Sequence, residues 1–241
     1  KGPPPAVAGK DFSGGLRFNE PPFDVTAPNI TPDKETGIGN WTDDQIKTLL
    51  TTGKNILGVQ AAEIMPTAFY PILTPGDLNA IVVYLRSLAP LKNKVPDPVY
   101  KIALPHHVFP GAEKPYAEAD LSDKVKKGFY LATIGHCMEC HTPVDKGVFD
   151  YQRTCAGGRL FSPAMVQGVS RRWRGAQAPN ITPHATAGLG QRTDQDIKRA
   201  ISQGVSRDGR KLQPPMPFGY YGQLRPADLD AIVAYLRTPR P

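Results

Sequence analysis

Apolar side chains recur with a helical period in two segments that lie far apart in the chain. Both sets occupy positions i, i+3, i+4 and i+7, and they are Leu78, Ile81, Val82 and Leu85, then Leu229, Ile232, Val233 and Leu236. A proline opens each segment, Pro75 and Pro226, where its missing N–H costs nothing. The pattern predicts two amphipathic helices, each burying one face.

Two shorter helices are predicted from capping boxes. Thr42 with Gln45, and Thr193 with Asp196, have the three-residue spacing of this motif. An apolar stripe follows each cap: Ile46, Leu49 and Leu50 in one segment, Ile197, Ala200 and Ile201 in the other.

A further helix is predicted over residues 122–136, "SDKVKKGFYLATIGH", with Val125, Phe129 and Ala132 on one side. No segment alternates with period two for long enough to make a sheet. The sequence therefore predicts an all-α fold.

The two halves of the chain are similar to each other. At a shift of 151 residues, "APNITP" at 27–32 matches "APNITP" at 178–183, and the alignment continues without a gap to the C-terminus, with 28 identities in 64 pairs. This repeat predicts two homologous domains in tandem, residues 1–90 and 120–241. The proline-rich segment 91–119 has no helical period and is expected to be an extended linker, whose apolar residues favour packing against both domains.

The composition, 40% hydrophobic and 21% charged residues, is that of a globular protein. The longest apolar run, "AIVVYL" at 80–85, is too short to span a bilayer. The first residues, "KGPPPAVAGKD", lack the apolar core of a signal peptide, so we expect a cytoplasmic protein or a mature or shortened form.

The formal net charge of +7 is unevenly distributed. Residues 1–90 carry 7 basic and 9 acidic residues, whereas residues 91–241 carry 22 and 13, so a charged partner is expected on the second half. Nucleic acid is not favoured, because no basic run exceeds "RRWR" at 171–174 and basic residues are not interleaved with aromatic ones.

The stretch "GHCMECHTP" at 135–143 contains the pair Cys137 and Cys140 followed directly by His141. Cys-x-x-Cys occurs in zinc sites, in redox disulfides and, with an adjacent histidine, at covalently attached haem c. Zinc would need a second ligand pair, and a thioredoxin-like site would need a βαβ setting. The pattern favours haem, with both cysteines bonded to one porphyrin and His141 as the proximal ligand.

Met216, within "QPPMPFGYY", is the candidate sixth ligand. Its counterpart Met65 is retained in the first copy although most residues around it differ, which favours ligation over simple core packing. Met138 lies inside the attachment motif, and Met165 has no counterpart in the first copy.

The second copy, and the first less its beginning, resemble the multi-haem cytochrome c subunits that partner bacterial alcohol, gluconate and sorbitol dehydrogenases and certain molybdenum hydroxylases. The resemblance rests on "GFYLATIGHCMECHTP", "GGRLF", "APNITP", "GLGQRTDQDI", "PPMP" and "LDAIVAYLR". It implies two tandem cytochrome c domains, each of a few short helices and long loops around a haem. It also implies a periplasmic location, and that Gly128 and Tyr130 meet the segment around Tyr235 and Leu236.

The first copy has no Cys-x-x-Cys-His, because the matching position falls just before residue 1. Either the sequence starts late and a second haem is attached upstream with Met65 as ligand, or the first copy has lost its haem. The retained Met65–Pro66 and "APNITP" favour the first alternative, and hence two haems.

Several other residues leave alternatives open. Trp41 and its counterpart Arg192 could lie near a haem propionate or serve packing alone. Cys155 is expected to be a buried thiol, the alternative being a disulfide to a cysteine upstream of residue 1. His106 and His107 have no third ligand nearby, so a metal site there is not favoured.

The prediction for function is electron transfer rather than catalysis. Closed His/Met ligation leaves no open site on the iron, and a dehydrogenase catalytic subunit would deliver electrons for relay to a quinone or terminal oxidase pathway. Membrane association would be peripheral, through the complex. The alternative is a haem enzyme, such as a dihaem peroxidase or a thiosulfate-oxidising cytochrome, with a replaceable ligand.

Overall fold

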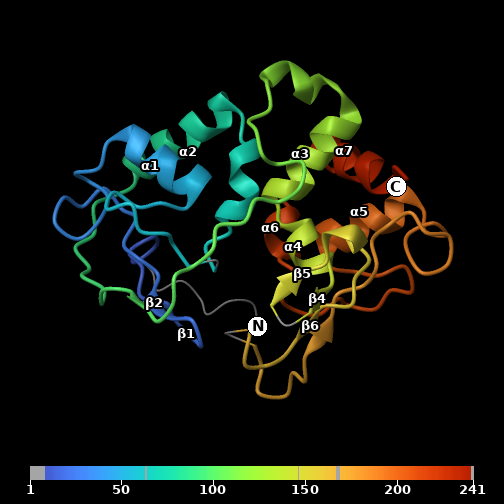
Figure 1. Ribbon diagram of the computed structural model, residues 1–241. Coiled ribbons are helices and arrows are strands. Elements are labelled where there is room, and N and C mark those ends of the chain that lie inside the picture. Colours follow the sequence, from blue (N-terminus) through green and yellow to red (C-terminus); the bar gives the residue numbers. More distant parts are fainter. Residues whose placement is uncertain (1–8, 63, 146, 167–168, 240–241) are drawn as a thin grey trace. The chain divides into compact units, whose positions relative to one another are not determined.

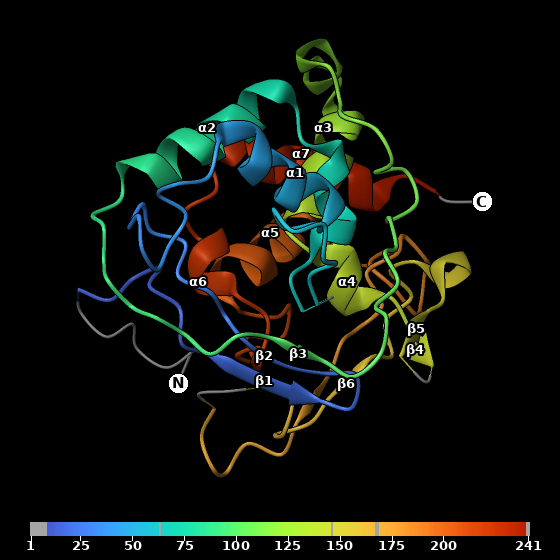
Figure 2. The ribbon, with the colours of Figure 1, turned by 60° about the vertical axis from the view of Figure 1, so that its left-hand side comes forward.

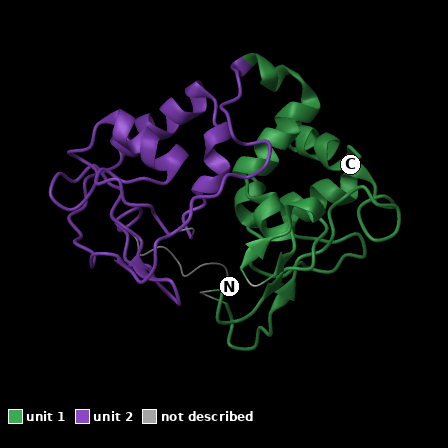
Figure 3. Ribbon diagram, in the orientation of Figure 1, with its two compact units in different colours: residues 1–5, 119–241 green, residues 6–118 purple. Residues whose placement is uncertain are grey.

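The computed structural model describes residues 9–62, 64–145, 147–166 and 169–239, which divide into two compact units (Figure 3). We call residues 6–118 the N-terminal unit and residues 119–241 the C-terminal unit. The division falls between Glu118 and Ala119, so the proline-rich segment up to residue 118 is part of the N-terminal unit.

Short helices and long loops make up most of both units (Figure 1). The N-terminal unit contains β1 (Arg17–Glu20), β2 (Phe23–Thr26), α1 (Asp43–Thr52), the 3-10 helix η1 (Thr67–Ile72), α2 (Pro75–Ser87) and β3 (Val99–Tyr100). The 3-10 helix η2 (Glu118–Ser122) spans the boundary between the units. The C-terminal unit then contains α3 (Lys124–Ile134), α4 (Cys137–His141), β4 (Val144–Asp145), β5 (Val148–Phe149) and the 3-10 helix η3 (Tyr151–Arg153). It continues with β6 (Leu160–Phe161), β7 (Ala176–Gln177), α5 (Asp194–Gln203), α6 (Phe218–Tyr221) and α7 (Pro226–Arg237).

The expectation that no segment forms a sheet is wrong. The strands β1 and β2 pair antiparallel, and β3 adds to β2. Within β2 the side chains of Phe23 and Val25 are buried and alternate with partly exposed ones. The C-terminal unit has two further antiparallel pairs, β4 with β5 and β6 with β7. Strands of two to four residues are too short for alternation to be recognised in a sequence.

The helices of the N-terminal unit form where the sequence predicts them. Thr42 and Gln45 complete a capping box at the start of α1, and Gly53 ends the helix in the left-handed region. Helix α1 packs beside α2 (Figures 1 and 2) around a cluster of Ile38, Ile46, Val82 and Leu85. None of the described helices combines the length and the apolar character needed to cross a membrane.

The segment between the sequence repeats packs on the N-terminal unit. The Phe109 ring stacks on Phe69 with centroids 5.2 Å apart, and the Tyr116 N–H donates to the Ile72 carbonyl. The Leu91 carbonyl accepts a hydrogen bond from the Asn29 side chain at 2.6 Å. These contacts make residues 91–118 an ordered part of this unit.

In the C-terminal unit α3 crosses α7 (Figures 1 and 2). The crossing is close because a Cβ on Gly128 would lie 1.9 Å from the Ala231 carbonyl oxygen and 2.7 Å from Tyr235 Cβ. The Phe129 ring meets the Tyr235 ring edge-on at 5.3 Å. The contact expected between Gly128 and the segment around Tyr235 is therefore confirmed.

An arginine clamp recurs in both units at the 151-residue shift of the sequence repeat. Arg237, at the end of α7, donates to the Leu189 and Arg192 carbonyls and to Asp194 at the start of α5. Arg86, at the end of α2, makes the same bonds to Ile38, Trp41 and Asp43. The apolar clusters repeat as well, with Leu189, Ile197, Val233 and Leu236 in the C-terminal unit.

Candidate haem site

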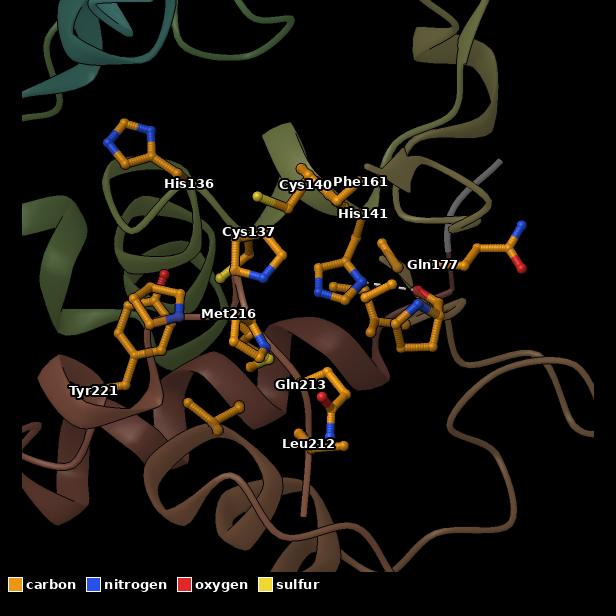
Figure 4. Close-up of a pocket in the computed structure, with 18 of the residues that line it drawn as sticks. His136, Cys137, Cys140, His141, Phe161, Gln177, Leu212, Gln213, Met216 and Tyr221 are labelled. Atoms are coloured by element: carbon orange, nitrogen blue, oxygen red, sulfur yellow. Dashed lines mark hydrogen bonds between the residues drawn. The ribbon is translucent and has the colours of Figure 1, made fainter. Parts of the chain in front are cut away.

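The Cys-x-x-Cys-His segment forms a helical turn of its own. Helix α3 ends at Gly135, His136 takes a left-handed conformation with φ 59°, and α4 then runs from Cys137 to His141. A spacing of three residues on a helix places Cys137 and Cys140 on the same side. The two cysteines and His141 all line one cavity of about 430 Å³ (Figure 4).

The cavity is mostly apolar. Its apolar walls come from β6 and β7, from the segment between β7 and α5, from α5 and α7, and from the loop that contains Met216. They include Phe161, Ala176, Ala178, Ile181, Leu189, Ile197, Ile201, Leu212 and Leu236. Polar side chains of Gln177, Arg210, Gln213 and Tyr221 also contribute to the lining.

His141 is held by one hydrogen bond. Its side chain is buried, and Nδ1 lies 2.8 Å from the Pro179 carbonyl oxygen. A carbonyl can only accept, so Nδ1 carries the proton and Nε2 keeps its lone pair. Burial lowers the pKa of His141, with the bond to Pro179 acting in the opposite direction. The imidazole is thus neutral and oriented, which is the form that ligates a metal.

Pro179 can reach His141 because a glycine lies beneath it. Gly157 has φ 75°, and a Cβ there would lie 2.4 Å from the Pro179 carbonyl carbon. The Gly157 N–H also donates to the His141 carbonyl at 2.7 Å. Any other residue would push Pro179 away from the imidazole.

Met216 lines the same cavity from the loop that precedes α6, between Pro215 and Pro217. Figure 4 shows Met216 and His141 reaching into the same space from different segments of the chain. The other two methionines of this unit do not line the cavity: Met138 is fully buried within α4, and Met165 is 56% exposed. Met216 is thus the methionine of this unit that shares the cavity with His141.

Tyr221 fixes the junction that precedes the cysteines. Its hydroxyl donates to the Gly135 carbonyl at 2.5 Å, at the end of α3. Burial is the main reason that the pKa of Tyr221 is raised, so the hydroxyl stays protonated and keeps this donor role.

The burial of Cys140 disfavours a redox dithiol. Burial, and after it the charge of Glu139, raises the pKa of Cys140 to about 11. A reactive redox cysteine has a lowered pKa, because the thiolate is the nucleophile. Arg159 donates to the Glu139 carbonyl at 2.6 Å and lies over the Phe149 and Phe161 rings.

The donor set fits a covalently attached haem. A haem c with His/Met ligation requires two thiols for its thioether bonds, a neutral imidazole, a thioether ligand and an apolar pocket for the porphyrin. All of these line this one cavity. A haem bound here would be held by Cys137, Cys140, His141 and Met216.

The remaining predicted residues lie elsewhere. Met65 is half-buried in the N-terminal unit, at the position equivalent to Met216. Trp41 packs against the apolar cluster of that unit, and exposed Arg192 does not line the cavity. Cys155 is fully buried, as expected, and His106 lies 3.5 Å from the Gln60 side chain, between Nδ1 and Nε2.

Sequence reasoning missed Arg210, Phe161 and Tyr221 as cavity residues. Tyr221 could have been found, since its counterpart Tyr70 is an identity of the repeat five residues beyond the methionine. Phe161 also had a signal, since it ends the motif "GGRLF" and its counterpart Phe18 is identical, whereas Arg210 had none, because its counterpart is Val59.

Comparison with known proteins agrees with this geometry. The family described as cytochrome c matches residues 125–239, from α3 through α7. Residues 125–239 are thus similar to a cytochrome c domain. The matched range contains both cysteines, His141 and Met216 of the candidate site.

The chain as a whole is similar to cytochrome c subunits of dehydrogenases, as the sequence motifs predicted. It is 29% identical over 245 residues to the fructose dehydrogenase cytochrome subunit of Gluconobacter japonicus, covering 95% of this chain and 48% of that subunit. It is 29% identical over 211 residues to the cytochrome c subunit of an alcohol dehydrogenase (quinone) of Gluconobacter oxydans, covering 83% and 43%.

A third relative is the dihaem cytochrome c-type protein of Cereibacter sphaeroides, 29% identical over 242 residues, which cover 94% of this chain and 75% of that protein. The chain thus spans about half the length of the two dehydrogenase subunits and three quarters of the dihaem cytochrome.

Proposed function

We propose that this protein transfers electrons through a haem c held in the C-terminal unit. The observation that carries the proposal is the placement of Cys137, Cys140, His141 and Met216 on one mostly apolar cavity. The haem, when bound, supplies one-electron oxidation and reduction of its iron.

The chain's own residues set the conditions for that chemistry. Pro179 orients His141 and fixes its tautomer through the bond to Nδ1. The apolar walls exclude water, and the thioether of Met216, if bound to the iron, would favour the reduced state and raise the potential.

A haem enzyme is the competing hypothesis, and the cavity argues against it. A haem iron held by both His141 and Met216 would have no ligand position free for a substrate. Among the lining residues the only other histidine is His136, which directly precedes Cys137, and none is Asp or Glu. A general acid or base on the Met216 side is therefore not part of this lining.

The test is ligand binding to the reduced protein. We expect no rapid binding of carbon monoxide and no rapid reaction with peroxide, while electrochemical reduction and reoxidation are reversible. Rapid reaction with either ligand in the wild type would overturn the assignment of a closed site.

We further propose that a dehydrogenase catalytic subunit delivers the electrons, and that they leave toward a quinone or terminal oxidase pathway. Support comes from the relatives, which are cytochrome subunits of fructose and alcohol dehydrogenases. Their similarity also supports an extracytoplasmic, periplasmic location for this protein.

The N-terminal unit is proposed to be a second cytochrome c domain with Met65 as an iron ligand. Gly14, with φ 80°, approaches the Pro28 backbone as Gly157 approaches Pro179, with a Cβ only 2.6 Å from the Pro28 carbonyl carbon. The unit therefore keeps the backbone arrangement that presents a carbonyl to the proximal histidine. The dihaem relative supports the same proposal.

The surface of α2 also supports a second domain of this kind. In the C-terminal unit, Ala231 is buried and Tyr235 half-buried where α7 meets α3. The equivalent Ala80 and Tyr84 of α2 are exposed, and Tyr84 is 53% accessible. This face has the chemistry of a docking surface for a helix of the α3 type, which would bring the second Cys-x-x-Cys-His.

A further inference from the structure

The loop between β6 and β7 is longer than its equivalent in the N-terminal unit. Arg17 of β1 pairs with Thr26 of β2, nine residues further along, whereas the equivalent Leu160 pairs with Gln177, seventeen residues further along. The C-terminal unit thus has eight more residues in this loop, which contains "RRWR" at 171–174. The strand pair forms in the N-terminal unit without them, so the fold does not require this charged segment.

The cavity of the candidate haem site opens to solvent beside this loop. Gln177, Arg210 and Gln213 line the cavity and are also exposed, so they mark its mouth. The Arg210 side chain is 68% exposed, and Lys211, which follows it, is exposed as well. Basic side chains therefore lie where a partner could approach a haem bound in the cavity.

Residues 171–174, which we call the arginine turn, lead directly to the same cavity. Gly175 lines the cavity, and Arg174 precedes it. The turn is held in place because Trp173 is buried and the Arg174 guanidinium donates to the Arg171 carbonyl at 3.3 Å. An ordered turn fixes where its charged groups lie relative to the mouth.

The arginines of the turn form no ion pair within the described part of the chain. Arg171, Arg172 and Arg174 are exposed, and the described carboxylates all lie more than 4.0 Å from them. Many other basic side chains of this unit are paired: Lys126 with Asp120, Lys127 and Arg225 with Asp228, Lys198 with Asp230, and Arg199 with Asp196. The charge of the turn is therefore available to a partner.

Acidic residues are missing from a long stretch of sequence around the turn. Residues 151–193 contain six arginines and no Asp or Glu. The carboxylates at the two ends of this stretch are already paired, Asp150 with Arg153 and Asp194 with Arg237. The sequence neighbours of the turn therefore do not neutralise it.

The two loops at the mouth together carry a net charge of +5. The loop 162–175 contains three arginines, and the loop 205–211 contains three basic residues and one acidic residue. The equivalent loops of the N-terminal unit, residues 21–22 and 54–60, contain one basic residue and no acidic one. This concentration of positive charge is a property of the C-terminal unit.

The charge and the residue type together favour a protein partner with an acidic face. Guanidinium groups bind carboxylates in a fixed planar geometry, and arginine is enriched at protein interfaces. A protein that exchanges electrons with a haem in this cavity must bring its own cofactor close to the mouth. Complementary charge at the mouth would both steer such a partner and fix its orientation.

We propose that the arginine turn, with Arg210 and Lys211, is the docking surface for the acidic face of a redox protein that exchanges electrons with the haem. The proposal rests on the electron-transfer function proposed above and deepens it by naming the surface and the chemistry of the partner. It assigns docking to the C-terminal unit.

The experiment measures the rate of haem reduction in the haem-loaded protein by stopped flow, with two reductants of opposite charge. Reduced flavodoxin is an acidic protein that carries FMN, and hexaammineruthenium(II) is a small cation; each gives one electron to the oxidised haem. The test variant combines Arg171→Gln with Arg172→Gln. Arg171 takes part in the turn through its carbonyl, so the hydrogen bond from Arg174 is kept.

We expect flavodoxin to reduce the double variant about threefold to fifteenfold more slowly than the wild type at an ionic strength of about 0.1 M. Electrostatic steering accelerates association by about 10- to 10³-fold. The variant removes two of the five net charges, and hence about two-fifths of that effect on a logarithmic scale. The two rates should converge at about 1 M salt, where charges are screened beyond about 3 Å, and reduction by the ruthenium cation should become faster in the variant.

The combination of Lys124→Gln with Lys126→Gln is the matched control. It removes the same charge from the same unit, at the start of α3, none of whose residues is among those that line the cavity. Its rate with flavodoxin should equal that of the wild type, because exposed charges are largely screened from each other beyond about 10 Å at 0.1 M salt.

An anionic bilayer is the competing occupant, because Leu160 and Met165 are exposed in the same hairpin. Sedimentation with vesicles of phosphatidylcholine and phosphatidylglycerol tests it. If the double variant sediments less than the wild type while its rate with flavodoxin is unchanged, the surface binds lipid and the proposal is overturned.

Two other results would also overturn it: equal flavodoxin rates in the wild type and the double variant, or an equal loss of rate in the control variant. Reduction by hexaammineruthenium(II) separates the two proposals. A protein that this cation does not reduce would refute electron transfer itself. A protein that it does reduce, and whose flavodoxin rate does not depend on the arginines, would refute the docking surface alone.

Discussion

Replacing Gly128 by alanine tests how the fold holds the attachment segment. Helix α3 is followed closely by α4, so the packing of α3 against α7 determines the position of Cys137. The added methyl carbon would lie 1.9 Å from the Ala231 carbonyl oxygen, which is 1.5 Å short of the 3.4 Å where ordinary contact begins. Because the obstacle is backbone, the helices themselves must move apart.

The expected cost follows from two opposing effects. Overpacking a well-packed site destabilises by about 1–3 kcal/mol, and a clash with backbone belongs at the upper end. Alanine recovers about 1 kcal/mol through its higher helix propensity. The net loss of about 2 kcal/mol corresponds to a fall of about 5–10 °C in the unfolding temperature of a unit this size.

The assay is thermal unfolding of the haem-loaded protein, followed by circular dichroism, together with the haem content of the purified variant. Gly219→Ala in α6 is the matched control, since a Cβ there meets nothing within 4 Å, and it should be at least as stable as the wild type. If Gly128→Ala proves as stable as Gly219→Ala and carries as much haem, the close helix crossing does not control this site.

Three other outcomes follow from the structure. Met216→Ala should lose the weak far-red sulfur-to-iron absorption band and have a lower haem reduction potential, whereas Met165→Ala should change neither. If Met216→Ala retains the band, Met216 is not the ligand. Arg237→Ala and Arg86→Ala should each lower the unfolding free energy of their own unit by about 1–3 kcal/mol in urea titrations, and a large difference between the two would contradict the shared clamp. Burial alone would raise the pKa of Asp228, but hydrogen bonds from Arg225 and Lys127 outweigh it and lower that pKa. The stability that this carboxylate contributes is therefore present above about pH 4 and is lost as the pH falls through the lowered pKa. In urea titrations, Asp228→Asn should be less stable than the wild type at about pH 7 and equally stable near about pH 2. A stability difference that stays constant with pH would refute the assignment.

Much of the helical fold was predictable because its signals are local. The capping boxes at Thr42 and Thr193 and the period of the apolar stripes in α2 and α7 depend on residues within one helix, and all four helices are present. The sheets were missed because strands such as β6 and β7, two residues each, are defined by pairing across a loop. The docking of residues 91–118 on the N-terminal unit likewise depends on distant partners, such as Phe109 on Phe69.

The candidate site was predictable to the extent that its chemistry is written in short motifs. Cys137, Cys140 and His141 follow from spacing, and Met216 from its retained counterpart. The role of the Pro179 carbonyl in orienting His141 was not predictable, because every residue has a backbone carbonyl and the residue type does not show which one accepts a hydrogen bond. Gly157, which allows its approach, is recognisable only once its positive φ is known.

The central claim is that a haem is bonded covalently to Cys137 and Cys140. The most direct test is to measure the haem content of the natively purified protein by pyridine haemochrome, together with the intact mass of the protein. The same measurement is made on the double variant Cys137→Ser, Cys140→Ser. The account predicts that the double variant has one covalent haem fewer per polypeptide than the wild type, and that the wild-type haem is found by mass on the peptide carrying these cysteines. A wild type without covalent haem, or a double variant with unchanged haem content, would contradict it.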